Sequence, residues 1–200
     1  MNYQLKPQVN IGPFKDNISV EITSGNVLVL TSKSINEIHQ IQNFFGAHNF
    51  QVISTVEPEL PFSYIEKLYS ELKFVPDVII AIGGGSVIDL GKALSVAKDF
   101  LILKDYYSKR LNNYKKHARM IAVPTTFGTG AETSFGSILY DDVQEKKDGL
   151  RSNIIQSDVV IIDSNLYSSA PSKIMAESGF DCLTHAIETY LSLATNEIVK

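Results

Sequence analysis

Apolar runs alternate with amphipathic segments through the first half of the chain. The runs NVLVL, FQVIST and DVIIAI predict three strands, at 26–30, 50–55 and 77–82. A capping box that begins at Ser34 predicts a helix to about His48, and apolar residues at helical spacing predict a second helix over 62–73. The third run is apolar on both faces, as a strand covered on both sides requires. This alternation predicts a doubly wound parallel sheet of the α/β class.

The second half of the chain is less regular. We expect a polar surface segment over 98–117 and a charged turn over 141–149. Further strands are expected at 120–123, 134–140 and 159–162. From Pro171 onward the pattern favours helix alone. The sequence therefore predicts a nucleotide-binding domain over 1–168 and the beginning of an all-helical domain over 169–200, which we expect to be truncated.

Composition excludes several classes of protein. The chain is 44% hydrophobic and 20% charged with a net charge of −4, which is typical of a globular protein and leaves no basic surface for nucleic acid. No segment reaches the roughly 18 apolar residues of a membrane span, and the start lacks the apolar core of a signal peptide. With a single cysteine, Cys182, the sequence predicts a cytoplasmic protein without nucleic-acid or membrane partners.

Three consecutive glycines follow the third strand. Gly83, Gly84 and Gly85 let the main chain approach a ligand closely, and the helix expected from Ser86 offers unpaired N–H groups. A glycine loop at the start of a helix is suited to bind a pyrophosphate, as in a Rossmann-like domain. The spacing differs from G-x-G-x-x-G, so a tight turn in which Ser86 and Asp89 cap the helix is the alternative.

The segment PTTFGTGAE over 124–132 follows another short strand. It supplies the hydroxyls of Thr125, Thr126 and Thr129 beside glycines, and loops at the carboxyl ends of strands bind ligands in open α/β sheets. A polar turn without a ligand is the alternative.

Asp181 and His185 lie four residues apart on an expected helix. A carboxylate and an imidazole at this spacing share one helical face and could hold one divalent ion. A hydrogen bond on the helix surface is the alternative, and two ligands do not complete a metal site. The apolar neighbours Phe180, Leu183 and Ile187 make a solvated face less favoured.

Together, the segments GGGSVIDLGK, VPTTFGTGAE and GFDCLTHAIETYLS resemble, in order and spacing, the signatures of the iron-containing (group III) alcohol dehydrogenases. The resemblance implies an NAD(P)-linked alcohol dehydrogenase or aldehyde reductase, in which hydride passes between nicotinamide C4 and a small aldehyde or alcohol. It implies a divalent metal that polarises the carbonyl oxygen, with Fe(II) first and Zn(II) as the alternative. It also implies a homodimer.

The resemblance assigns roles to individual residues. It implies that Asp181 and His185 are the first two metal ligands of an all-helical metal-binding domain, whose other two histidine ligands this sequence lacks. The cofactor-binding residues that it implies are Gly83, Gly84, Gly85, Ser86, Asp89, Thr125, Thr126, Thr129 and Lys147.

Several positions depart from the family pattern. Ser32 and Lys33 stand where an acidic residue commonly bonds the adenosine ribose, so we expect Ser32 to contact the cofactor and NADP(H) to be tolerated or preferred. A solvated surface charge at Lys33 without a role in cofactor binding is the alternative. Glu59 replaces an asparagine and is expected to point away from the pyrophosphate. Gly136 replaces an asparagine of some members and receives no role. Cys182 is expected to be a buried helix residue.

Other functions remain as alternatives to the dehydrogenase. One is a catalytically inactive nucleotide-binding fragment, which the activity of the isolated chain would distinguish. Another is a relative of glycerol dehydrogenase or 3-dehydroquinate synthase, although PTTFGTGAE followed by DCLTH resembles the alcohol dehydrogenases more closely. The sequence does not identify the substrate.

Overall fold

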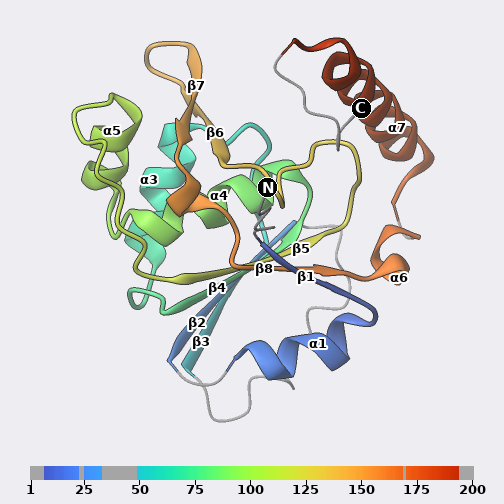
Figure 1. The fold of residues 1–200 in the computed structure, drawn as a ribbon. Helices are drawn as coiled ribbons and strands as arrows, with labels where there is room; N and C mark the ends of the chain where they lie inside the picture. Colours follow the sequence, from blue (N-terminus) through green and yellow to red (C-terminus); the bar gives the residue numbers. More distant parts are fainter. Residues whose placement is uncertain (1–6, 23–24, 33–48, 169, 194–200) are drawn as a thin grey trace, which may run out of the picture.

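The computed structural model of the chain describes residues 7–22, 25–32, 49–168 and 170–193. A parallel sheet runs through this part of the molecule, with the strand order β1-β8-β5-β4-β2-β3 (Figure 1). Its strands are β1 (Gln8–Ile11), β2 (Asn26–Thr31), β3 (Asn49–Ile53), β4 (Val78–Gly83), β5 (Arg119–Pro124) and β8 (Val159–Ile162). The predicted Rossmann-like α/β class is confirmed.

Helices cover both faces of the sheet. Helix α1 lies on one face, and helices α3, α4 and α5 lie on the other (Figure 1). The bounds are α1 (Phe14–Glu21), α3 (Phe62–Glu71), α4 (Gly85–Val96), α5 (Phe100–Tyr107), α6 (Ser164–Tyr167) and α7 (Ser172–Leu191). The helix expected from Ser34 to His48 lies outside the described residues.

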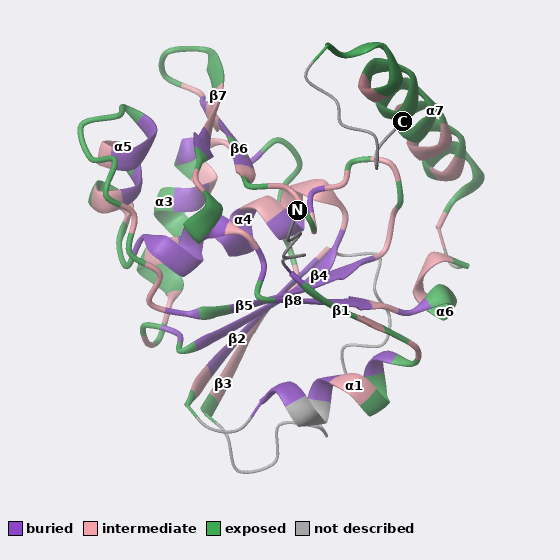
Figure 2. Cartoon of the chain, viewed as in Figure 1, coloured by how far each residue is buried: buried purple, intermediate pink, exposed green. Residues whose placement is uncertain are grey.

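Alternation along the strands explains why the sheet is buried on both sides. In β2, Leu28 and Leu30 pack into the core beneath α3, α4 and α5, whereas Val27 and Val29 pack into the core beneath α1. Every residue of β4 is buried, and Figure 2 shows the central strands buried along most of their length. Burial of the strand on both faces therefore explains why the segment DVIIAI is apolar on both faces.

A separate antiparallel hairpin projects above α4. It consists of β6 (Gly136–Asp141) and β7 (Lys146–Arg151). The fully buried Lys92 of α4 holds its base: the ammonium donates to the carbonyl oxygens of Ser134 and Gly136, both at 2.9 Å. The expected charged turn over 141–149 is wrong in part. The second half of this segment pairs with β6 as part of strand β7.

Strand β1 and helices α1 and α5 arise where no element was expected. Strand β1 and helix α1 precede the first predicted strand. Strand β1 pairs with β8, which is distant in the sequence. The expected polar segment over 98–117 contains α5, which Asp99 caps by accepting the N–H of Ile102 at 2.9 Å. Polar residues dominate this segment, but tertiary contacts bury its apolar minority against α3 and α4.

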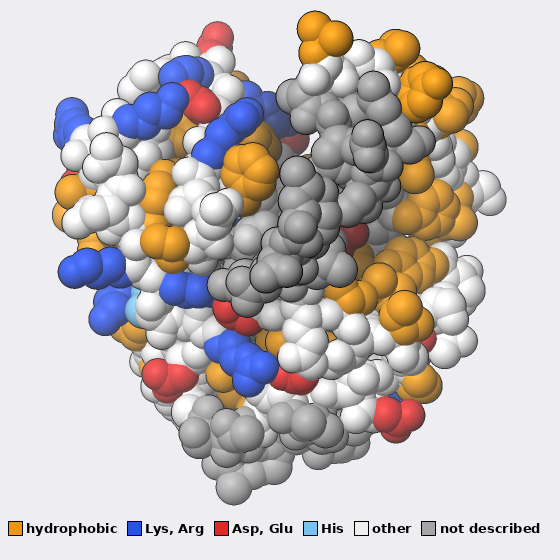
Figure 3. All heavy atoms as spheres, in the orientation of Figure 1, with side chains coloured by type: hydrophobic (Ala, Val, Ile, Leu, Met, Phe, Trp, Pro, Cys, Tyr) orange, Lys and Arg blue, Asp and Glu red, His pale blue; other side chains and the backbone are white. Residues whose placement is uncertain are grey.

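Helix α7 is 20 residues long, yet none of its residues is buried. Phe180 and Leu183 are 72% and 55% exposed, so the expectation that apolar flanks keep this helix out of solvent is wrong for the described structure. Cys182 is exposed rather than buried. Hydrophobic side chains gather on the surface around α7 in Figure 3. The domain boundary at 168/169 stays a prediction.

No helix in the described ranges combines the length and the apolar character that crossing a membrane requires.

Candidate cofactor and metal site

The two predicted ligand loops meet at the carboxyl edge of the sheet. Strands β4 and β5 are neighbours, with Gly83 paired to Pro124, and the N–H of Thr125 donates to the Gly83 carbonyl oxygen at 3.1 Å. A Cβ atom on Gly84 would lie 3.1 Å from Thr126 Oγ1, which is tighter than ordinary side-chain contacts. The absence of a side chain at Gly84 therefore lets the loops pack together.

Helix α4 begins directly behind this contact. Its N-cap is Gly84, which has no side chain to bond the first N–H groups, so these can bind an anion. Ser86 and Asp89 do not cap the helix. Ser86 Oγ accepts the N–H of Glu59 at 3.4 Å, and Asp89 accepts the N–H of Ile138 at 3.0 Å. The capping alternative is thus wrong.

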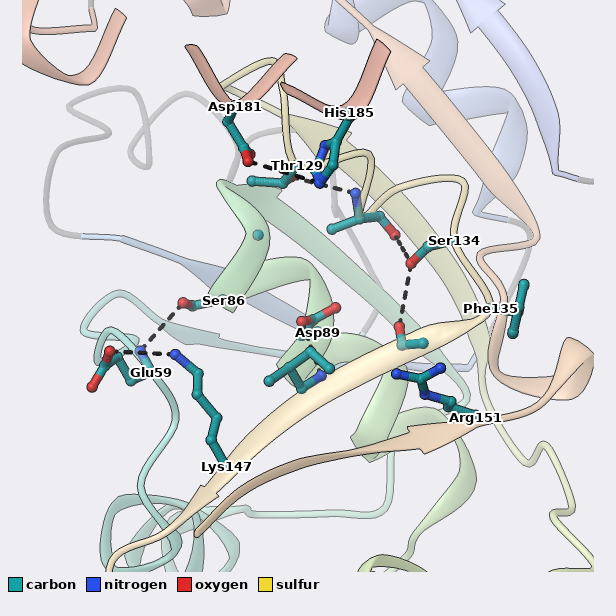
Figure 4. A pocket seen from close by; sticks show the side chains of 14 residues that line it. Glu59, Ser86, Asp89, Thr129, Ser134, Phe135, Lys147, Arg151, Asp181 and His185 are labelled. Carbon is teal, nitrogen blue, oxygen red and sulfur yellow. Dashed lines mark hydrogen bonds and ion pairs between the residues drawn. The ribbon is translucent and has the colours of Figure 1, made fainter. Parts of the chain in front are cut away.

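A cavity of about 650 Å³ lies in front of the helix start, between the hairpin and α7 (Figure 4). The predicted site residues that line it are Gly85, Ser86, Asp89, Thr129, Lys147, Asp181 and His185. Gly83, Gly84, Thr125 and Thr126 are not part of its lining and support it from the loops behind. One space therefore borders residues from four separate segments of the sequence.

Ser32 lies elsewhere. It borders a second hollow, of about 670 Å³, at the end of β2 and beside α3. The charged residues around this hollow are Glu57, Lys67 and Glu71, with Lys67 and Glu71 in an ion pair at 3.9 Å. Lys33 lies outside the described residues. The structure therefore separates Ser32 from the other predicted cofactor residues.

Glu59 turns toward the cavity, contrary to the expectation that it points away. Its carboxylate lies 3.3 Å from Lys147 Nζ, and both residues line the cavity. Glu59 adopts a left-handed backbone with φ of 64°, an uncommon conformation that places its side chain opposite β7. Lys147 provides a counter-charge for Glu59 that the sequence alone did not place there.

Asp89 and Lys92 form a largely buried charged pair beneath the cavity. Lys92 Nζ lies 4.0 Å from Asp89 Oδ1, with side-chain exposures of 0% and 14%. Burial raises the pKa of Asp89 to about 6 and lowers the pKa of Lys92 to about 8. Sequence reasoning missed Lys92, although a lysine three residues after an aspartate in an apolar helix is a signal for such a pair.

The predicted metal ligands share one face of α7. His185 Nε2 and Asp181 Oδ1 are 3.8 Å apart, and His185 Nδ1 lies 2.8 Å from the carbonyl oxygen of Gly128. Since a carbonyl only accepts, Nδ1 is assigned as the donor, which leaves the Nε2 lone pair on the side of Asp181. This donor set fits a divalent cation. Among the described residues, no group of three or more metal-binding side chains exists.

A close approach of main chains holds α7 at the cavity. Gly128 has a φ of 113°, and a Cβ atom there would lie 2.3 Å from the Ser178 carbonyl oxygen. Only glycine permits this contact without displacement of the helix. The loop that carries Thr129 is therefore in direct contact with the helix that carries Asp181 and His185.

Further lining residues were not expected from the sequence. They are Glu59, Ala131, Ser134, Phe135, Gly136, Ile138 and Arg151. Arg151 and Lys147 lie on one face of β7 because alternate residues of a strand point the same way. The sequence reveals this shared face only when 146–151 is recognised as a strand.

The parallel sheet, the glycine loop and the cavity at its carboxyl edge define a Rossmann-like α/β protein. The model of the iron-containing alcohol dehydrogenase family matches residues 15–164, and the chain belongs to this family.

Individual relatives agree with this assignment. The chain is 31% identical to an alcohol dehydrogenase from Thermococcus barophilus over 193 residues, which cover 88% of the chain and 50% of the relative. It is 36% identical to an NADPH-dependent butanol dehydrogenase from Clostridium saccharobutylicum over 71% of the chain and 38% of the relative. Its fold is similar to sulfoacetaldehyde reductase from Bifidobacterium kashiwanohense in complex with NAD+, with a TM-score of 0.80, 26% identity, and coverage of 96% and 53%. The chain thus spans about half the length or less of these relatives.

Proposed function

We propose that the chain provides the dinucleotide site and two metal ligands of an enzyme that transfers a hydride between NAD(P)H and a small aldehyde. The observation that carries this proposal is the shared cavity, which borders the start of α4, Lys147, and the pair Asp181 and His185. A phosphate site and a cation site facing one space are what a metal-assisted dehydrogenase needs. Family membership supports the same reaction class.

The proposed reaction is the reduction of an aldehyde with NAD(P)H and one proton to a primary alcohol and NAD(P)+. When bound, the nicotinamide would supply the hydride from C4 to the carbonyl carbon, and the carbonyl oxygen would take up a proton from solvent. The first N–H groups of α4 and the Lys147 ammonium stabilise the diphosphate of the cofactor. The protein's main contribution is to hold the two carbons close and aligned.

Asp181 and His185 would hold the divalent metal, with Fe(II) as the first expectation and Zn(II) as the second. When bound, the metal supplies Lewis-acid polarisation of the carbonyl oxygen. The contact of His185 Nδ1 with Gly128 orients the imidazole before any metal arrives.

Both NADH and NADPH are proposed as cofactors. Ser32 carries no charge that repels a 2′-phosphate, and Lys67 borders the same hollow. One relative is named NADPH-dependent and another was solved with NAD+. Glu57 and Glu71 also border the hollow, which favours tolerance of NADPH over a strong preference for it.

Titration of the purified chain with NADH and NADPH, followed by nicotinamide fluorescence, tests the cofactor site. The sharpest variant is Lys147→Met, because this lysine faces the cavity. Lys146→Met is the matched control, since Lys146 pairs with Asp148 at 3.0 Å and does not line this cavity. We expect about tenfold weaker binding for Lys147→Met and no change for the control. Equal affinities for the two variants, or no saturable binding, would contradict the cofactor site.

Turnover separates the dehydrogenase from the nucleotide-binding fragment. The second function is kept because two metal-ligating side chains meet in the described residues and no third joins them. Dinucleotide binding without aldehyde reduction, in the presence of added Fe(II) or Zn(II), would favour the fragment. Reduction that depends on the metal and is lost in His185→Ala would favour the dehydrogenase.

A further inference from the structure

Two basic side chains of strand β7 face the cavity, and only one of them is neutralised. Lys147 is paired with Glu59 at 3.3 Å. Arg151 lies four residues further along the same face of the strand and also lines the cavity. Within the described ranges, no carboxylate forms an ion pair with the Arg151 guanidinium and no acceptor bonds it.

The wall around Arg151 has room for a ligand group. In the antiparallel register of the hairpin, Arg151 lies directly opposite Gly136. A Cβ atom added at Gly136 would have one neighbour within 4 Å, the Leu150 carbonyl oxygen at 4.0 Å, so no side chain fills the space above this glycine. Because Gly136 has no side chain, the N–H donors of the long Arg151 side chain can reach across this position.

The other basic side chains that border the cavity have partners among the described residues. Lys147 bonds Glu59, and His185 Nδ1 bonds the carbonyl oxygen of Gly128. Asp89 accepts the N–H of Ile138 and faces Lys92. Arg151 is therefore the cation of this cavity that lacks a counter-ion among the described residues.

The position of Arg151 separates it from the proposed phosphate site. Figure 4 shows Arg151 below Phe135, at the end of the cavity away from Ser86 and Glu59. The diphosphate of the cofactor is proposed at the start of α4, which is marked by Ser86. With the diphosphate at the start of α4, a negative group that meets Arg151 would belong to the second reactant.

We propose that Arg151 binds an anionic oxyacid group of the substrate, so that the preferred substrates are small aldehydes that carry a carboxylate or sulfonate. This inference rests on the proposed function. A guanidinium bonds such planar or tripodal oxyanions with two parallel N–H groups, which a lysine does not reproduce. The aldehyde carbon receives the hydride and its oxygen the proton, while the anionic group stays unchanged.

Binding of matched alcohols tests the inference without turnover. The probes are 4-hydroxybutanoate, 2-hydroxyethanesulfonate and 1-butanol, titrated calorimetrically into the chain with and without NADH. We expect Arg151→Met to weaken binding of the two anions by about 10- to 100-fold and to leave 1-butanol unchanged. Arg110→Met is the matched control, because Arg110 pairs with Asp105 at 3.7 Å and does not line this cavity. The stronger of the two anions identifies the oxyacid class.

Three outcomes would overturn the inference. They are equal binding of anionic and neutral alcohols, no binding of either, and an Arg151→Met variant that loses NADH affinity as much as anion affinity. Kinetics with 4-oxobutanoate and butanal supply a second readout, with the ratio of their kcat/KM values expected to fall in Arg151→Met. If anion binding depends on Arg151 but neither aldehyde is reduced, the proposed hydride transfer fails while the anion site stands.

Discussion

Helices α4 and α7 border the same cavity but are held in opposite ways. Leu90 and Lys92 of α4 are fully buried between the sheet and the hairpin. Helix α7 has no buried residue and is positioned at Gly128, through a main-chain approach and the hydrogen bond to His185. The proposed phosphate side of the site is thus built into the core, whereas the proposed metal side depends on a contact at the surface.

This difference between α4 and α7 indicates how well the described residues can support cofactor binding and metal binding on their own. A helix start anchored by a buried core keeps its N–H groups in place without a ligand. An exposed helix that carries two proposed metal ligands would gain stability from a metal that binds them. Cofactor binding is therefore expected to be more robust to substitutions in this chain than metal binding.

The largest effect is expected for Lys92→Met. Removal of the ammonium leaves Asp89 without its counter-charge and leaves the carbonyl oxygens of Ser134 and Gly136 without a donor. We expect the free energy of unfolding to fall by about 4 kcal/mol, measured by urea denaturation. Lys147→Met, which removes an exposed ion pair, is the control and should cost less than about 1 kcal/mol. Similar losses for the two variants would show that the hairpin is not anchored through Lys92.

A matched pair of leucines tests the contrast between the helices directly. Leu90→Ala in α4 removes a fully buried side chain and should cost about 3 kcal/mol of unfolding free energy. Leu183→Ala in α7 removes a side chain that is 55% exposed and should cost less than about 0.5 kcal/mol. A large loss in Leu183→Ala would mean that α7 is buried in solution, for instance against another copy of the chain.

A smaller effect is expected from pH. The folded pKa of Asp89 is about 6, compared with an ordinary value of 3.8. Between these values the unfolded chain releases a proton that the folded chain retains. Stability should therefore fall by about 2 kcal/mol as the pH rises from 4 to 6 and then level off. Asp89→Asn should lack this decrease in a pH series of denaturation curves, and an unchanged slope would contradict the burial of the carboxyl.

The smallest effect on global stability is expected for His185→Ala. Loss of the hydrogen bond to Gly128 should cost less than about 1 kcal/mol of unfolding free energy. Hydrogen exchange in the presence of a chelator should nevertheless speed up in α7 and stay unchanged in β4 and β5. Uniformly faster exchange would show that α7 and the sheet unfold as one unit.

Sequence patterns predicted the central strands well because each is apolar on the faces that it buries. The run at 159–162 coincides with β8, and the runs at 26–30 and 77–82 fall within a residue of β2 and β4 at each end. Strand β7 was missed because its residues, KKDGLR, have a charged pattern that indicates a turn. It is a strand because its backbone pairs with β6, which no local preference reveals.

The candidate site was predictable where a motif is local. The glycine loop, the Thr129 loop and the Asp181–His185 pair could each be read from adjacent residues, and the structure brings them to one cavity. Glu59 and Arg151 could not be assigned, since their surroundings come from segments distant in the sequence. Ser32 was grouped with the cofactor residues but borders a different hollow.

The sequence by itself determined the class of fold and the family and indicated candidate site residues, because hydrophobic alternation, glycine runs and helical spacing are local signals. Only the tertiary structure decided how the charges around the cavity are surrounded. The carbonyl oxygen of Ser134 that Lys92 bonds and the Lys147 ammonium that neutralises Glu59 are both more than 40 residues away in the sequence. The surroundings of Arg151 depend on the pairing of β7 with β6. Electrostatic interactions act through space, and the distances that set their strength exist only once the chain has folded.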